Sequence, residues 1–62
     1  MVLAALPASA VQKVTGGPAP YKTEAAQLAK AECKKRGGTP TGTYWYWYDE
    51  SNWYAYVECA GI

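Results

Sequence analysis

The chain has 62 residues, with six basic and five acidic side chains and a formal net charge of +1. A charge this small provides no overall field that would concentrate nucleic acid or an anionic membrane at the protein. Histidine is absent, which removes the commonest general base and metal ligand, and two cysteines alone cannot complete a tetrahedral zinc site. No apolar run approaches the ~20 residues that cross a bilayer. We therefore expect one small domain that is not an enzyme and has no metal, cofactor or membrane span.

The first ten residues differ in composition from the rest of the chain. Residues 2–6 are apolar, Pro7 interrupts them, and Ala8-Ser9-Ala10 fits the small-x-small pattern after which signal peptidase cuts. This pattern predicts that residues 1–10 are the remnant of a signal peptide and that the mature chain begins near Val11. The alternative is an alanine-rich flexible leader. A signal peptide would place the protein in an oxidising compartment, the periplasm or the extracellular space.

Residues 11–20 are expected to form a linker. The apolar residues Val11 and Val14 would suit a short strand only if another strand pairs with it. Residues 16–20, Gly-Gly-Pro-Ala-Pro, are typical of a linker, because glycine permits unusual backbone angles and proline disfavours helix in the residue before it. The folded domain is then residues 21–62.

A helix is predicted from Thr23 to about Arg36. Thr23 is a suitable N-cap, and Glu24 lies where the positive end of the helix dipole favours a carboxylate. Gly37 is the expected left-handed residue after the helix, and Pro40 prevents the helix from resuming.

One face of this helix carries only small residues. Ala25 or Ala26, then Ala29, then Cys33 recur at helical spacing. A face this small would allow bulky indole rings of a sheet to approach the helix closely. The basic residues at the end of the helix, Lys30 and residues 34–36, are explained by the helix dipole and by solubility, so they do not favour nucleic acid as a partner.

All but one of the nine aromatic residues lie between Tyr44 and Tyr56. They alternate on both sides of a polar turn, residues 49–52, and this alternation predicts an antiparallel hairpin with aromatic side chains on both faces. Two registers are open. Pairing Asp49 with Trp53 would leave a loop of residues 50–52, whereas pairing Tyr48 with Trp53 would leave a four-residue loop and turn the tyrosines of the first strand towards the core.

We favour the first register, because it buries indole and aliphatic surface while the tyrosine hydroxyls stay in water. The tryptophans Trp45, Trp47 and Trp53 would then be core residues, together with Ala55, Val57 and Cys59. The opposite face would present the predicted binding residues Tyr44, Tyr46, Tyr48, Tyr54 and Tyr56. Aromatic residues of this kind anchor interfaces. The alternative is that these tyrosines only stabilise the sheet through cross-strand contacts.

Cys33 and Cys59 are predicted to form a disulfide between the helix and the last strand. The cysteines are 26 positions apart (59 − 33), and closing a loop of that size stabilises a domain by about 3.5 kcal/mol in the chain-entropy model. Two free thiols in a cytosolic protein are the alternative.

The expected fold is a small α+β domain: one helix on a two-stranded antiparallel aromatic hairpin, with room for a third short N-terminal strand, stapled by one disulfide. The expected function is that of a secreted, non-enzymatic binding module for a protein or glycan partner. One alternative is a structural, self-assembling subunit, because residues 44–48 form an uncharged strand-prone edge. A second alternative is an antimicrobial or toxin-like protein, although the weak positive charge argues against membrane attack.

Overall fold

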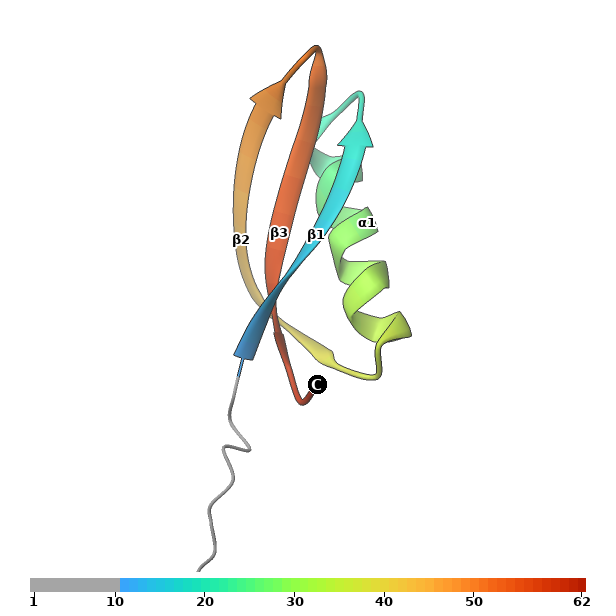
Figure 1. Cartoon of the computed structure of the whole chain (residues 1–62), viewed down its shortest axis with the longest axis vertical. Coiled ribbons are helices and arrows are strands. Elements are labelled where there is room, and N and C mark those ends of the chain that lie inside the picture. The colour runs from blue at the N-terminus through green and yellow to red at the C-terminus, as the bar shows by residue number, and fades with distance from the viewer. Residues whose placement is uncertain (1–10) are drawn as a thin grey trace, which may run out of the picture.

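A computed structural model describes residues 11–62 as one helix packed on a three-stranded antiparallel sheet (Figure 1). The elements in chain order are β1 (Val11–Ala19), α1 (Lys22–Lys35), β2 (Thr39–Asp49) and β3 (Asn52–Ala60). The strand order is β1-β3-β2, so the last strand is the central one and pairs with both others. The small α+β fold is confirmed, and its third strand is present. The predicted signal-peptide remnant, residues 1–10, lies outside the described residues.

β1 occupies most of the segment that was expected to be a linker. It pairs with β3 from Val11 opposite Ala60 to Gly16 opposite Ala55, and after a register shift Ala19 lies opposite Trp53. The linker prediction is therefore wrong for residues 16–19. Glycine is needed in this strand for packing, because a Cβ on Gly16 would lie 2.7 Å from the carbonyl oxygen of Ala25 in α1.

The N-cap of α1 lies two residues before the predicted one. Tyr21 is the N-cap, with an extended backbone and no capping hydrogen bond from its side chain, so the Thr23 N-cap prediction is wrong. The backbone carbonyl of Tyr21 accepts hydrogen bonds from the N–H groups of Glu24 and Ala25, both 3.1 Å. Glu24 lies in the first turn, as expected from the helix dipole.

The end of α1 is a Schellman motif. Gly37 has a φ of +88°, which confirms the predicted left-handed residue. Its N–H donates to the carbonyl of Lys34 at 2.9 Å, and the N–H of Gly38 donates to the carbonyl of Cys33 at 3.0 Å. The motif turns the chain directly from α1 into β2.

The core consists of small side chains. The predicted helix face, Ala25, Ala29 and Cys33, is buried, and it packs against five buried strand residues: Val14, Ala19, Ala55, Val57 and Cys59. The helix lies mainly over β1 and β3 and leaves β2 at the side (Figure 1). The expectation that indole rings would fill the small helix face is wrong, because the backbone of β1 at Gly16 takes that place.

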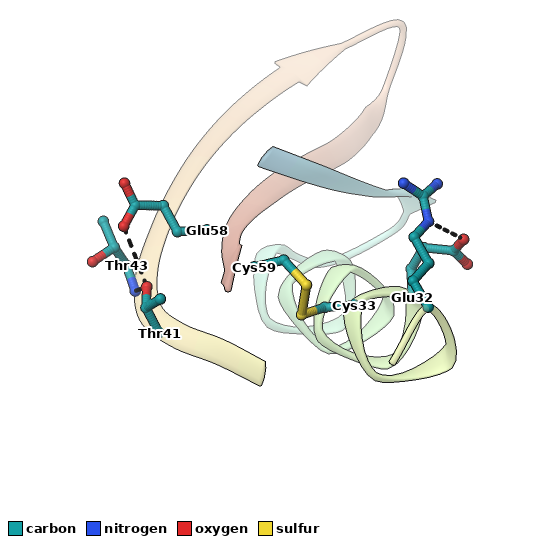
Figure 2. Close-up of a disulfide and its surroundings, with 7 residues drawn as sticks. Glu32, Cys33, Thr41, Thr43, Glu58 and Cys59 are labelled. Carbon is teal, nitrogen blue, oxygen red and sulfur yellow. Dashed lines mark hydrogen bonds and ion pairs between the residues drawn. A yellow bond between two sulfur atoms is a disulfide. The ribbon is translucent and has the colours of Figure 1, made fainter. Parts of the chain in front are cut away.

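The predicted disulfide is confirmed. Cys33 and Cys59 are bridged with a Cα–Cα distance of 5.7 Å, and both residues are fully buried (Figure 2). Gly38 lies directly beside the bridge. A Cβ on Gly38 would clash with Sγ of Cys59 and would lie 2.7 Å from Cγ2 of Ile62. The bridge fixes the C-terminal end of α1 to the end of β3.

The hairpin has the register that we did not favour. Tyr48 lies opposite Trp53. Asp49 and Asn52 also pair, so the loop contains only Glu50 and Ser51 instead of the expected four residues. Both loop residues have positive φ angles, 50° and 67°, as a type I′ turn requires. The favoured pairing of Asp49 with Trp53 is wrong because α1 lies mainly over β1 and β3. Among the described elements none packs over the indoles of β2, so indole burial does not select the register.

Candidate functional site: the aromatic hairpin

The aromatic residues of the hairpin form two sets, one on each face of the sheet. The far-face cluster, on the side away from α1, contains Trp45, Trp47, Tyr54 and Tyr56. The helix-side set contains Tyr44, Tyr46, Tyr48 and Trp53. This division follows from the register, because residues directly opposite each other on neighbouring strands point to the same face.

The predicted placement of the tryptophans and tyrosines is corrected by this arrangement. Trp45 and Trp47 are 39% and 38% exposed and are not core residues, whereas Trp53 packs against the core. The five predicted binding tyrosines do not share a face: two belong to the far-face cluster and three to the helix-side set. Their role in binding stays a prediction.

The far-face cluster is a continuous chain of ring contacts. Trp47 stacks on Tyr54 with centroids 5.1 Å apart and planes 9° from parallel. Trp47 also contacts Tyr56 at 5.1 Å, and Tyr56 meets Trp45 edge to face at 5.9 Å. Such pairs add roughly 0.5–1.5 kcal/mol each beyond the area they bury, so the cluster is held rigidly in place.

Lys13 adds a positive charge to the far-face cluster. Its Nζ lies 4.8 Å from the ring centroid of Trp45 and 5.8 Å from that of Tyr56, within the range of a cation–π interaction. Sequence reasoning missed Lys13. The available signal was its alternation with Val14, which places Lys13 on the face away from the core once residues 11–14 are taken as a strand.

Part of the ring surface of the far-face cluster is covered by neighbouring residues. One face of Tyr54 is stacked on Trp47, and its Cδ2 would lie 3.1 Å from a Cβ on Gly17 of β1. Lys13 occupies a face of Trp45. Trp45 and Trp47 stay 39% and 38% exposed, so the cluster presents indole surface to solvent.

The helix-side set is more open at the tip of the hairpin. Tyr46 and Tyr48 are 40% and 59% exposed, and Tyr48 contacts Trp53 with centroids 5.2 Å apart. Lys22, at the start of α1, places its Nζ 5.1 Å from the ring centroid of Tyr46 and 5.6 Å from that of Trp53. This lysine connects the helix to the hairpin, so the set serves in part to position α1.

β2 is an edge strand whose two halves differ. Its register with β3 shifts between Pro40 and Tyr44, and there the hydroxyl of Thr41 donates to the carboxylate of Glu58 at 3.3 Å (Figure 2). The same hydroxyl accepts a hydrogen bond from the N–H of Thr43 at 3.4 Å. From Tyr44 to the turn the pairing is regular. The second half of β2 therefore has a regular outer edge with which no strand of residues 11–62 pairs.

Within residues 11–62 no pocket is found, and no cluster of histidine, cysteine, aspartate and glutamate could hold a metal ion. In the same part of the chain no helix has the length and apolar character to cross a membrane. Comparison with family models, with curated proteins and with solved structures finds no match to this chain. The functional inference accordingly rests on the aromatic hairpin.

Proposed function

We propose that this protein is a small, non-enzymatic binding module that docks on a protein partner through the far-face cluster. One observation carries the proposal: four aromatic side chains in mutual contact lie on a sheet face that none of the described elements covers. Tyrosine and tryptophan are enriched at the centres of protein interfaces, where rigid rings bury a large area at little conformational cost.

A protein partner suits this cluster better than a glycan does. A sugar ring stacks on the open face of an aromatic ring, and here Trp47 stacks on one face of Tyr54 and Lys13 lies over one face of Trp45. Ring edges carry partial positive charge and pair well with carbonyl oxygens and with other aromatic edges, which a protein surface supplies. A glycan partner is kept as an outcome of the test.

We further propose that the protein is secreted. A fully buried disulfide between α1 and β3 supports this, because stable structural disulfides are typical of oxidising compartments. Intact mass of protein from its native source, before and after reduction with alkylation, tests this proposal together with the predicted start near Val11. Two alkylatable thiols in unreduced native material would place the protein in a reducing compartment.

Paired variants on the two faces test the binding proposal. Trp47→Thr removes the centre of the far-face cluster, and Tyr48→Thr is the matched control on the opposite face at the next position of the same strand. A binding partner is captured by crosslinking, purified and titrated against each variant by calorimetry. Loss of a central aromatic anchor costs about 2 kcal/mol or more, so Trp47→Thr should weaken binding by at least about 30-fold and Tyr48→Thr by less than about threefold.

Two results would redirect this proposal. Equal affinity of both variants for the partner would show that the far-face cluster is not the docking surface. Binding of the wild type to a glycan array, lost in Trp47→Thr and kept in Tyr48→Thr, would show that the surface is correct and that its partner is a glycan.

A further inference from the structure

We propose that β2 pairs with β2 of a second copy of this chain, antiparallel, around a two-fold axis at Tyr46. The two sheets then join into one. This inference concerns the edge of the sheet and stands independently of the docking function proposed for its face.

The backbone groups needed for this pairing point out of the sheet. In a hairpin closed by a two-residue turn, the flanking residues Asp49 and Asn52 exchange both hydrogen bonds, and hydrogen-bonded pairs then alternate with non-hydrogen-bonded ones. The alternation directs the N–H and C=O groups of Trp45 and Trp47 towards β3. It directs those of Tyr44, Tyr46 and Tyr48 away from β3, where no described strand meets them.

This half of the edge lacks the features that usually prevent pairing. Natural edge strands are protected by charged residues, prolines and bulges. In β2, Pro40, the register shift and Gly42, with a φ of +99°, all lie before Tyr44, and Asp49 is the strand's first charged residue. The edge of β1, in contrast, has Lys13 and Pro18 along its length.

The sequence of the edge fits a second copy of itself. Residues 44–48, Tyr-Trp-Tyr-Trp-Tyr, read the same in both directions. Antiparallel pairing reverses the partner strand, so an axis at Tyr46 places Tyr44 opposite Tyr48 and Trp45 opposite Trp47 of the second copy. Every tyrosine then meets a tyrosine on the helix side, and every tryptophan meets a tryptophan on the far face.

Hydrogen-bond parity selects this register. If the partner strand shifted by one residue, outward-pointing N–H and C=O groups of one copy would lie opposite inward-pointing groups of the other. The tyrosines of one copy would then share a face with the tryptophans of the other. A shift by two residues would restore the parity but leave a tyrosine of each copy without its counterpart. Centring on Tyr46 uses the outward groups of all three tyrosines.

The same register is compatible with the side chains at both ends of the edge. Asp49 would lie opposite Thr43 and Glu50 opposite Gly42 of the second copy, so no carboxylates face each other. Trp47 would lie beside Trp45 of the second copy, on the same side of the joined sheet. The far-face clusters of both copies would then form one row across the joined sheet.

Two measurements on the unmodified protein test this arrangement. In dilute solution the amides of Tyr44, Tyr46 and Tyr48 should exchange with solvent faster than those of Trp45 and Trp47, and at high concentration all of them should be protected. Isotope-filtered spectra of mixed labelled and unlabelled chains should show a contact between the Hα of Trp45 and that of Trp47 in the other copy, because non-hydrogen-bonded pairs bring Cα atoms to about 4.5 Å. A chain that stays monomeric at all concentrations, or a dimer without this contact, would overturn the proposal.

A variant pair at Tyr46 separates backbone from side-chain contributions. Tyr46→Pro removes an outward N–H without removing a hydrogen bond to β3, and Tyr46→Thr keeps the N–H in a strand-forming residue. By sedimentation equilibrium, Tyr46→Pro should weaken dimerisation by roughly 10 to 100-fold relative to Tyr46→Thr. Equal dimerisation by both variants would overturn pairing through the backbone edge. A wild type that binds its partner but stays monomeric at all concentrations would overturn this inference and leave the proposed docking function standing.

Discussion

Gly16 of β1 lies directly against Ala29 of α1, so that a Cβ on Gly16 would be 2.7 Å from the Cα of Ala29. No side chain separates strand from helix at this point. The close approach explains why the core contains only alanine, valine and cysteine side chains: the two layers are too near each other for larger ones. The disulfide between Cys33 and Cys59 joins the C-terminal end of the helix to the sheet, with a Cα–Cα distance of 5.7 Å.

A methyl group at Gly16 should therefore be far more disruptive than one at an open glycine. Gly16→Ala would push α1 away from β1, and overpacking of this kind costs about 3 kcal/mol or more when the obstacle is backbone. Gly37→Ala is the control: nothing lies within 4 Å of its Cβ, so only the left-handed conformation is penalised, at about 1–2 kcal/mol. Urea denaturation of both variants gives the comparison. Equal losses would show that β1 and α1 are not in backbone contact.

The disulfide should account for a large part of the stability. Replacing both cysteines with serine should lower the free energy of unfolding by about 3.5 kcal/mol from the loop-closure entropy alone, and the buried hydroxyls would add to the loss. Because both cysteines are fully buried, reductant should open the bridge only when the domain unfolds. The rate of reduction should then rise with urea concentration in parallel with unfolding. A bridge that is reduced rapidly in the folded protein would contradict the observed burial.

Substitutions in the turn of the hairpin should be able to raise the free energy of unfolding. Glu50 and Ser51 both have positive φ angles, which cost a non-glycine residue about 1–2 kcal/mol each, and Asn-Gly is the pair that best tolerates this conformation. The double variant Glu50→Asn with Ser51→Gly should raise the free energy of unfolding by about 1–2 kcal/mol. Ser51→Val should lower it, because a β-branched residue is poorly suited to positive φ. Thermal melts check both signs, and a destabilised Asn-Gly variant would contradict the type I′ turn.

The parts of the fold that depend on few elements were predictable from the sequence. The parity of β3 followed from Cys59 alone, because a disulfide to the helix requires the odd-numbered residues of that strand to face it. Gly37 marked the end of the helix, because only the local backbone is involved. Neither inference needed the third strand.

The register of the hairpin was not predictable, because it depended on what covers β2. Residues 16–19 of β1 have the composition of a linker, and their glycines show their packing role only when α1 and Tyr54 are placed against them. With β1 in the sheet, α1 moves over β1 and β3, and the burial argument that favoured indoles in the core loses its basis. One strand that was predicted only as a possibility thus reversed the assignment of the β2 tyrosines and tryptophans.

Side chains on the two faces of the hairpin should contribute unequally to the free energy of unfolding, and Trp47 and Trp53 illustrate the difference. Trp47 is 38% exposed and packs only on neighbouring rings of the far-face cluster, so Trp47→Ala should cost about 1 kcal/mol from lost cross-strand contacts. Trp53 packs against the core, so Trp53→Ala should cost about 3 kcal/mol, the lower end of the range for large-to-small core substitutions. Urea denaturation at concentrations too low for self-association measures both losses.

Tyr48→Ala, which changes the most exposed aromatic residue of β2, is the control for general loss of strand propensity and should cost about 0.5 kcal/mol. Tryptophan fluorescence gives a second readout: the emission of Trp53 should shift to longer wavelength on unfolding more than that of Trp47, because Trp53 loses a drier environment. A loss at Trp47 equal to that at Trp53 would mean that the indoles of β2 face the helix. If Trp47→Ala instead leaves the fold intact, the exposed indole is available for a role outside folding, such as the proposed docking or strand pairing.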